Sequence, residues 1–238
     1  MEFLRICYTL KLLSGGLWGS VSRGLEADIV TSSCRHASGE DIPCIHSTYI
    51  KGLLRRSLEY IEDHLYKFGV IGVINIVKEI FGPLTPFEDE AQGVASNIVI
   101  APLFPMKNES SAIEICRDKP LSYLSRIDVI AKPELYIEPH IRIDDRVGTV
   151  SIGGLYSELK VVPQTLFYGE IIFYTDREDK ALEVARALSI AIASLRTQYA
   201  GIRTVVQPKI LSITYRGINM AKDDIVGMVI DLLNRGSS

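Results

Sequence analysis

Residues 42–56 read IPCIHSTYIKGLLRR, a turn that leads directly into a helix. Ser47 or Thr48 can cap this helix, which we expect to continue to about Lys67. Its apolar residues recur at helical spacing, at Ile50, Leu53, Leu54, Leu58, Ile61 and Leu65. The opposite face is basic, and we expect it to face solvent; it carries Lys51, Arg55 and Arg56.

Strand patterns lie on both sides of this helix. Residues 2–13 alternate loosely and predict a half-buried strand. Residues 14–46 then form one long loop, rich in glycine and serine, and loops of that length are usually functional. After a short helix at 72–81 the chain is rich in residues that favour strands, with strands expected at 97–104, 121–131, 135–143, 155–162 and 166–174. A helix at about 177–198, a strand at 209–215 and a helix at 222–234 follow, so we expect an α+β fold with helices on a mostly antiparallel sheet.

Composition limits the class of protein. The 238 residues are 47% hydrophobic and 23% charged, which is ordinary for a folded soluble chain. The net charge of −3 excludes a chain that is basic throughout, so any nucleic-acid surface must be a local patch. Cysteines at 7, 34, 44 and 116 form no regular framework, and no leader or membrane span is visible. We therefore expect a cytoplasmic protein from a reducing compartment, with no membrane partner.

The start of the helix near residue 47 is a candidate anion site. Helix N-termini expose unpaired backbone N–H groups and the positive end of the helix dipole. Lys51 and Arg55 are four residues apart, so they share a face and can hold consecutive phosphates. The alternative is a capped helix whose basic face is solvated.

This stretch resembles the RAMP superfamily, whose members form type III CRISPR effector complexes. The similar residues are Pro43, Ile45, Thr48, Ile50, Lys51, Gly52, Leu54, Arg55, Phe81-Gly82, 95–100, 141–150, Leu155-Tyr156, Val162-Pro163 and Phe167. The resemblance implies a single modified RRM-like (ferredoxin-like) domain over residues 1–238, with a functional loop at 14–46. It also implies a lid-like insertion at about 68–94 and a thumb-like hairpin at about 132–165.

The resemblance further implies the repeated backbone subunit of a type III CRISPR ribonucleoprotein. Its partners would be guide RNA, target single-stranded RNA, other copies of itself and other effector subunits. It would bind the guide and cleave the target at regular intervals as an endoribonuclease within the complex. Two alternatives stay open: a RAMP subunit that does not cleave, and an unrelated α+β enzyme or ligand-binding domain.

The site residues implied by the resemblance fall into two groups. Asp28 and His36 are the catalytic candidates, with Asp28 binding a divalent cation such as Mg²⁺ or orienting the RNA 2′-hydroxyl; the alternative for Asp28 is a loop acid without a role. The RNA-binding candidates are His46, Ser47, Thr48, Lys51, Arg55, Arg56, His140, Arg142, Arg146 and Arg203. In the thumb-like hairpin, an apolar wedge that flips a guide base would be formed by Val147, Val150 and Ile152. A plain edge strand protected by charge is the alternative for this hairpin.

Two Cys-x-His pairs lie ten residues apart in the long loop, as Cys34-Arg35-His36 and Cys44-Ile45-His46. Four nitrogen and sulfur ligands can complete a tetrahedral zinc site, although a spacing of one residue is tighter than usual. The alternative is a pair of reduced thiols with an exposed histidine.

Overall fold

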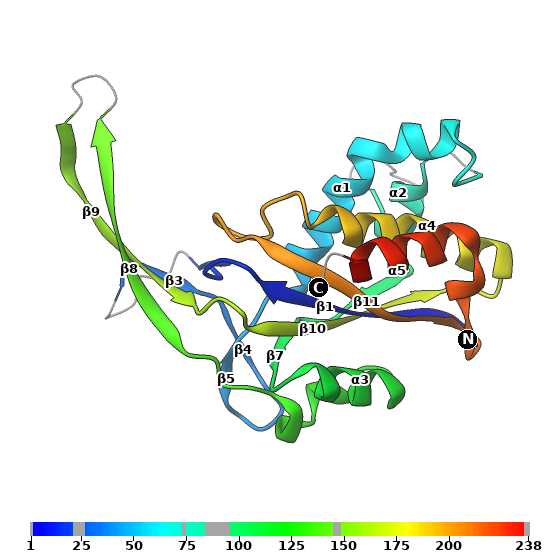
Figure 1. Cartoon of the computed structure of the whole chain (residues 1–238), viewed down its shortest axis with the longest axis horizontal. Coiled ribbons are helices and arrows are strands. Elements are labelled where there is room, and N and C mark those ends of the chain that lie inside the picture. The colour runs from blue at the N-terminus through cyan, green and yellow to red at the C-terminus, as the bar shows by residue number, and fades with distance from the viewer. Residues whose placement is uncertain (1, 21–26, 73–74, 84–95, 145–148, 236–238) are drawn as a thin grey trace.

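A computed structural model describes residues 2–20, 27–72, 75–83, 96–144 and 149–235 (Figure 1). In this part of the chain, six strands form the main sheet, and every pair in it is antiparallel. The order is β12-β11-β1-β10-β6, and β7 also pairs with β10. The strands are β1 (Phe3–Leu12), β6 (Ile98–Ile100), β7 (Phe104–Met106), β10 (Leu166–Tyr174), β11 (Val206–Tyr215) and β12 (Ile218–Asn219).

Strand β1 is the central strand of this sheet, and both of its faces are buried. Leu4, Ile6 and Leu10 are fully buried in a large apolar cluster on one face. Cys7 belongs to a second apolar cluster, which must lie on the other face because neighbouring residues of a strand point to opposite sides. The main sheet therefore has a core on each side.

Helices cover the first face of the main sheet (Figure 1). They are α1 (Ser47–Lys67), α2 (Ile76–Phe81), α4 (Glu178–Ser194) and α5 (Asp224–Arg235). Taken in chain order, β1, α1, β6, β10, α4 and β11 form the β-α-β-β-α-β arrangement of ferredoxin-like folds. The prediction of an α+β, RRM-like fold is confirmed.

The second face is covered by the segment between β7 and β8. It contains α3 (Glu109–Arg117) and the 3₁₀ turns η1 (Ser122–Leu124) and η2 (Ile127–Val129). The expected strand at 121–131 is therefore wrong, and α3 was not predicted. A buried ion pair holds this segment: Arg5 binds Glu170 at 2.7 Å and donates to the carbonyls of Cys116 and Asp118. The amide of Leu121 also donates to Glu170, so tertiary contacts favour turns here over an extended strand.

A second sheet contains a long hairpin that projects from the body of the molecule (Figure 1). Its strand order is β2-β3-β9-β8, and a separate pair joins β4 to β5. The strands are β2 (Gly19–Ser20), β3 (Ile29–Thr31), β4 (Ser33–Arg35), β5 (Asp41–Pro43), β8 (Leu135–Asp144) and β9 (Thr149–Val161). The segment expected to be one long loop at 14–46 contains four short strands, β2 to β5, in its described part. In the expected lid-like insertion at about 68–94, residues 73–74 and 84–94 lie outside the described residues.

Candidate nucleic-acid interface

Helix α1 begins one residue earlier than expected. His46 is its N-cap residue, and the His46 carbonyl accepts hydrogen bonds from the amides of Tyr49 and Ile50. No side chain caps the helix, so the prediction that Ser47 or Thr48 would cap it is wrong. Among the described hydrogen bonds, none uses the amides of Ser47 and Thr48, and the first turn contains no acidic residue. Unpaired amides without nearby acids are the features by which helix N-termini can accept an anion.

The basic residues of α1 differ in exposure. Lys51 is half-buried and donates to the Ser96 hydroxyl at 3.3 Å, and burial followed by the nearby Arg55 charge lowers its pKa. The Arg55 side chain is only 17% exposed and pairs with Glu59 at 2.8 Å. Arg56 is exposed. The expectation that the whole basic face points to solvent is therefore wrong for Lys51 and Arg55, because neighbouring groups hold their side chains.

Gly52 leaves the backbone of α1 open beside these side chains. The residue is exposed, and a Cβ atom built on it would meet nothing within 4 Å. Glycine inside a helix is less favourable than alanine by about 1 kcal/mol. Packing among the described residues does not require a glycine at this position, and glycine is a residue that permits close approach to the backbone.

Asp28 lies just before β3 and is exposed. The amide and the hydroxyl of Ser157 on β9 donate to its Oδ2 atom, at 2.8 and 3.2 Å. The carboxylate is therefore held against the base of the β8–β9 hairpin, and its other oxygen accepts no bond among the described contacts. A carboxylate that is oriented and exposed can bind a hard cation or accept a proton.

His36 does not lie in an exposed loop. Its side chain is buried, with 2% of the residue exposed, and its ring packs edge-to-face on Phe104. Nδ1 accepts from the Ser38 amide, and Nε2 lies 3.3 Å from the Tyr123 carbonyl. The neutral tautomer with a proton on Nε2 satisfies both nitrogens. No described contact joins His36 to Asp28, so the structure does not bring the two catalytic candidates together.

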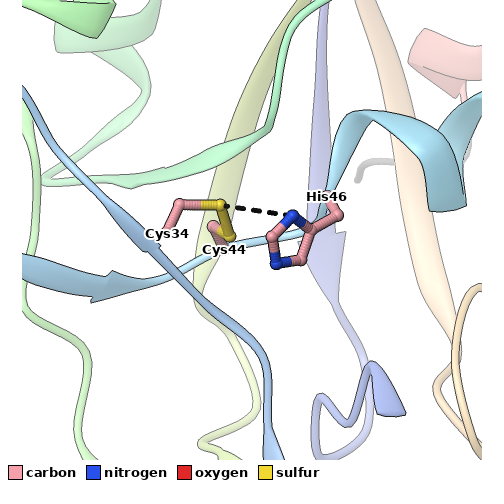
Figure 2. A group of neighbouring side chains, drawn as sticks. All are labelled: Cys34, Cys44 and His46. Carbon is pink, nitrogen blue, oxygen red and sulfur yellow. Dashed lines mark hydrogen bonds between the residues drawn. A yellow bond between two sulfur atoms is a disulfide. The ribbon is translucent and has the colours of Figure 1, made fainter. Parts of the chain in front are cut away.

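Cys34 and Cys44 form a disulfide, with the Nδ1 atom of His46 at 4.0 Å from the Cys34 sulfur (Figure 2). The expectation of reduced thiols is therefore wrong in this structure. Pairing of β4 with β5 brings the two cysteines together, with Cα atoms 5.6 Å apart. His36 is not part of this group. The four-ligand zinc set expected from the sequence is thus reduced to three residues.

The thumb-like hairpin corresponds to β8 and β9. The Nε2 atom of His140 lies 2.9 Å from Glu158, whose buried carboxylate also pairs with Lys160 at 2.8 Å. Glu138 pairs with Lys160 as well; this hydrogen bond and the more distant Arg203 lower the Glu138 pKa. Several predicted site residues are not described here: Arg146 and Val147 lie outside the described residues, as do the side chains of Arg142, Val150 and Ile152.

A comparison with family models decides the classification. The model of the RAMP superfamily matches residues 36–201, more than half of the chain. The chain belongs to the RAMP superfamily. The RAMP match includes the start of α1 and the β8–β9 hairpin, whereas Asp28 precedes it and Arg203 follows it.

A solved structure shares the fold of this RAMP chain. A chain in the cryo-EM structure of the type III-B Cmr-beta complex in its apo state matches with a TM-score of 0.54 and 16% identity. That match covers 87% of this chain and 96% of the other. A chain of the same complex bound to cognate target RNA gives a TM-score of 0.47 and 15% identity over 76% and 87% of the two chains. No curated protein matches.

An exposed apolar face on the hairpin of this RAMP protein was not predicted. Alternate residues of β8 point outward and are apolar, and Leu155 on β9 lies beside Ile141 with 73% of its surface exposed. The members of this face are Leu135, Ile137, Ile141 and Leu155. The period of two was visible in the sequence, but it did not tell which side faces the body of the protein. Grouped exposed apolar side chains indicate an interaction surface.

No helix in the described ranges is both long enough and apolar enough to cross a membrane.

Proposed function

We propose that this RAMP protein is an RNA-binding subunit of a cytoplasmic type III CRISPR effector complex. It holds the phosphates of the guide RNA at the start of α1, while base pairing supplies sequence specificity. Family membership and the likeness in fold to a chain of the Cmr-beta complex support this assignment.

The observation that carries the proposal is the open start of α1. The first turn of α1 has unused amides and contains no acidic residue. The exposed backbone of Gly52 follows, next in sequence to Lys51 and one turn before Arg56. Backbone amides and cations are the groups that bind phosphate oxygens. The ion pair between Arg55 and Glu59 leaves Arg56 as the exposed cation of this turn.

The main sheet supports this position indirectly. In RRM domains, RNA bases stack on the open face of the sheet. Here α3 and the two 3₁₀ turns cover that face, and the buried pair of Arg5 with Glu170 holds them there. The covered sheet face therefore supports binding of RNA beside the sheet, and we place it where α1 begins.

The exposed apolar face of the hairpin supports a place within an assembly. Leu135, Ile137, Ile141 and Leu155 would otherwise remain in water. Burial against RNA bases, another copy of the chain or another effector subunit gives these side chains a favourable environment. We extend the proposal to repeated, stacked copies along the guide.

Target cleavage centred on Asp28 is the second part of the proposal. Ser157 orients this carboxylate while leaving it exposed. Mg²⁺ is commonly held by one or two carboxylates together with substrate phosphates. Asp28 and the RNA would thus hold the cation jointly, which lowers the pKa of a bound nucleophile and stabilises charge on the cleaved phosphate. His36 is not included, because its ring nitrogens are already satisfied.

Arg56→Glu tests guide binding. We expect the variant to retain guide RNA at least about tenfold less well in filter binding, because the exposed cation becomes an anion. In the wild type, retention of guide RNA should weaken steeply as the salt concentration rises. Lys67→Glu is the charge-matched control at the far end of α1, where Lys67 pairs with exposed Asp63. Equal loss in both variants, or no loss in either, would refute the assigned site. An absence of RNA binding even after assembly with partner subunits would favour an unrelated enzyme or ligand-binding domain.

Asp28→Asn tests cleavage in a reconstituted complex. The amide keeps the size of the side chain but removes its charge, so target cleavage should be lost while guide and target binding persist. Wild-type complex treated with a chelator should lose the same activity. Cleavage unchanged by Asp28→Asn would leave a structural, non-cleaving subunit as the function.

A further inference from the structure

Two sulfur atoms and one imidazole meet immediately before α1. The ligand atoms of Cys34, Cys44 and His46 all lie within 4.8 Å of one another (Figure 2). Cys44 is fully buried, Cys34 is half-buried and His46 is exposed, so the group opens to solvent on the histidine side. RNA contact by α1 does not require the sulfur atoms, and the proposed function leaves their role unexplained.

We propose that Cys34, Cys44 and His46 form a binding site for one soft divalent cation, of which Zn²⁺ is the best fit, when the disulfide is reduced. Thiolate and imidazole are the ligands that Zn²⁺ prefers over harder cations. The fourth position is taken by water, since no other His, Cys, Asp or Glu of the described residues joins the group. This inference does not rest on the proposed RNA-binding function, although His46 is also the N-cap residue of α1.

The geometry needs little adjustment to hold the cation. Ligands that share one tetrahedral Zn²⁺ at the usual bond lengths place sulfur and nitrogen about 3.6 Å apart. The His46 Nδ1 atom is 4.0 Å from the Cys34 sulfur, so this pair is close to the required separation. The cysteine Cα atoms are 5.6 Å apart across the β4–β5 pair, and rotation about the Cα–Cβ bonds separates the sulfurs once their bond is broken.

The chemical balance links the two states. A cellular or added dithiol reduces the Cys34–Cys44 bond by exchange; its own two thiols become a disulfide, and the two cysteines take up two electrons and two protons. Binding of Zn²⁺ then releases those protons, leaving two thiolates whose charge cancels that of the cation. The N-terminus of α1 stabilises the thiolates, because the positive end of the helix dipole lies beside them.

A second group of possible ligands, Glu138, His140 and Glu158, does not compete as a site. The ammonium group of Lys160 already lies 2.8 Å from Glu158 and pairs with Glu138. A metal ion there would have to displace a cation of the chain itself. In the binding experiment, the hairpin group is the other place in the described residues where a bound metal ion could lie.

Metal binding by the purified full chain tests the proposal. The chain is reduced with a dithiol, freed of reductant without air, and titrated with Zn²⁺ alone against a chromophoric chelator; Co²⁺ reports the ligands through thiolate-to-metal charge transfer. We expect one ion per reduced wild-type chain. Cys34→Ser, Cys44→Ser and His46→Ala should each weaken binding by more than the about 10- to 100-fold that loss of an outer-shell contact costs. Cys116→Ser, which removes a cysteine outside the group, should bind as the wild type does.

The oxidised wild-type chain provides a control that needs no substitution. Its thiols are consumed by the disulfide, so it should show neither tight Zn²⁺ binding nor the charge-transfer band. Failure of the reduced chain to bind Zn²⁺, or equal affinity in the oxidised chain, would overturn the proposal. Wild-type affinity in Cys34→Ser or in His46→Ala would overturn it as well, and would direct attention to the hairpin group.

Discussion

Replacing Gly52 by alanine should affect the stability of the protein and its binding of RNA in opposite directions. Gly52 lies within α1, and its added methyl group would meet no atom of the described residues within 4 Å. Alanine is more favourable than glycine in a helix by about 1 kcal/mol. For a chain of this size, that gain raises the melting temperature by about 2–4 °C. The substitution should therefore stabilise the protein.

The same substitution should weaken RNA binding. The methyl group extends from the surface on which we propose that phosphates approach the backbone, beside Lys51 and Arg56. Forcing a methyl group into a packed contact typically costs about 1–3 kcal/mol, and 1.4 kcal/mol corresponds to about tenfold in the dissociation constant. We thus expect at least about tenfold weaker retention of guide RNA from a more stable protein. A higher melting temperature together with weaker RNA retention would exclude misfolding as the cause, because a misfolded protein would also be less stable.

Thermal unfolding and filter binding on the same preparation test this prediction. Tyr60→Ala is the matched control, because Tyr60 is uncharged, 84% exposed and two turns farther along α1. Alanine there also improves helix propensity, by about 0.5 kcal/mol, and should leave RNA binding unchanged. A Gly52→Ala protein that is more stable and binds RNA as tightly as the wild type would refute the placement of RNA against this backbone.

Three further substitutions test the packing and the surfaces. Glu170→Ala leaves Arg5 as an unpaired buried charge, so chemical denaturation should show a loss of about 3–5 kcal/mol in the free energy of unfolding. Asp223→Asn breaks the 2.6 Å ion pair with Arg186 while retaining a good capping residue for α5. Because Arg186 holds the Asp223 pKa below its usual value, the deficit of about 2 kcal/mol should be complete at neutral pH and vanish in acid as pH falls through the lowered pKa. Leu155→Ser should change stability by less than about 0.5 kcal/mol but reduce assembly with partner subunits, measured by co-purification and size-exclusion chromatography.

Local pattern was sufficient to predict the helical and central parts of the fold. The apolar spacing predicted α1 (Ser47–Lys67) to within one or two residues at its start, and residues that favour strands predicted β10 as Leu166–Tyr174. Each of these elements buries one regular face or lies within a sheet, so local periodicity and tertiary packing favour the same structure. The α+β fold followed from their order.

The failures come from contacts that join distant parts of the chain. The apolar residues of 121–131 favour a strand, but the long-range bond from Glu170 to the Leu121 amide holds turns. Burial of His36 depends on Tyr123, which is 87 residues away. The histidine therefore looked like an exposed loop residue when only its neighbours in sequence were visible.

The hairpin and the helix start must act together if several copies bind one RNA. On β8 the apolar side chains Ile137 and Ile141 face outward, whereas Glu158 and Lys160 on the paired strand β9 are almost fully buried on the opposite face. This is the reverse of a strand that protects its own core, an arrangement that is typical of a surface covered by a partner. Asp28 is bound to the base of the same hairpin through Ser157, and a partner that moves the hairpin would therefore also move the carboxylate. Cleavage by Asp28 should accordingly depend on assembly, and the isolated chain should bind RNA weakly without cutting it.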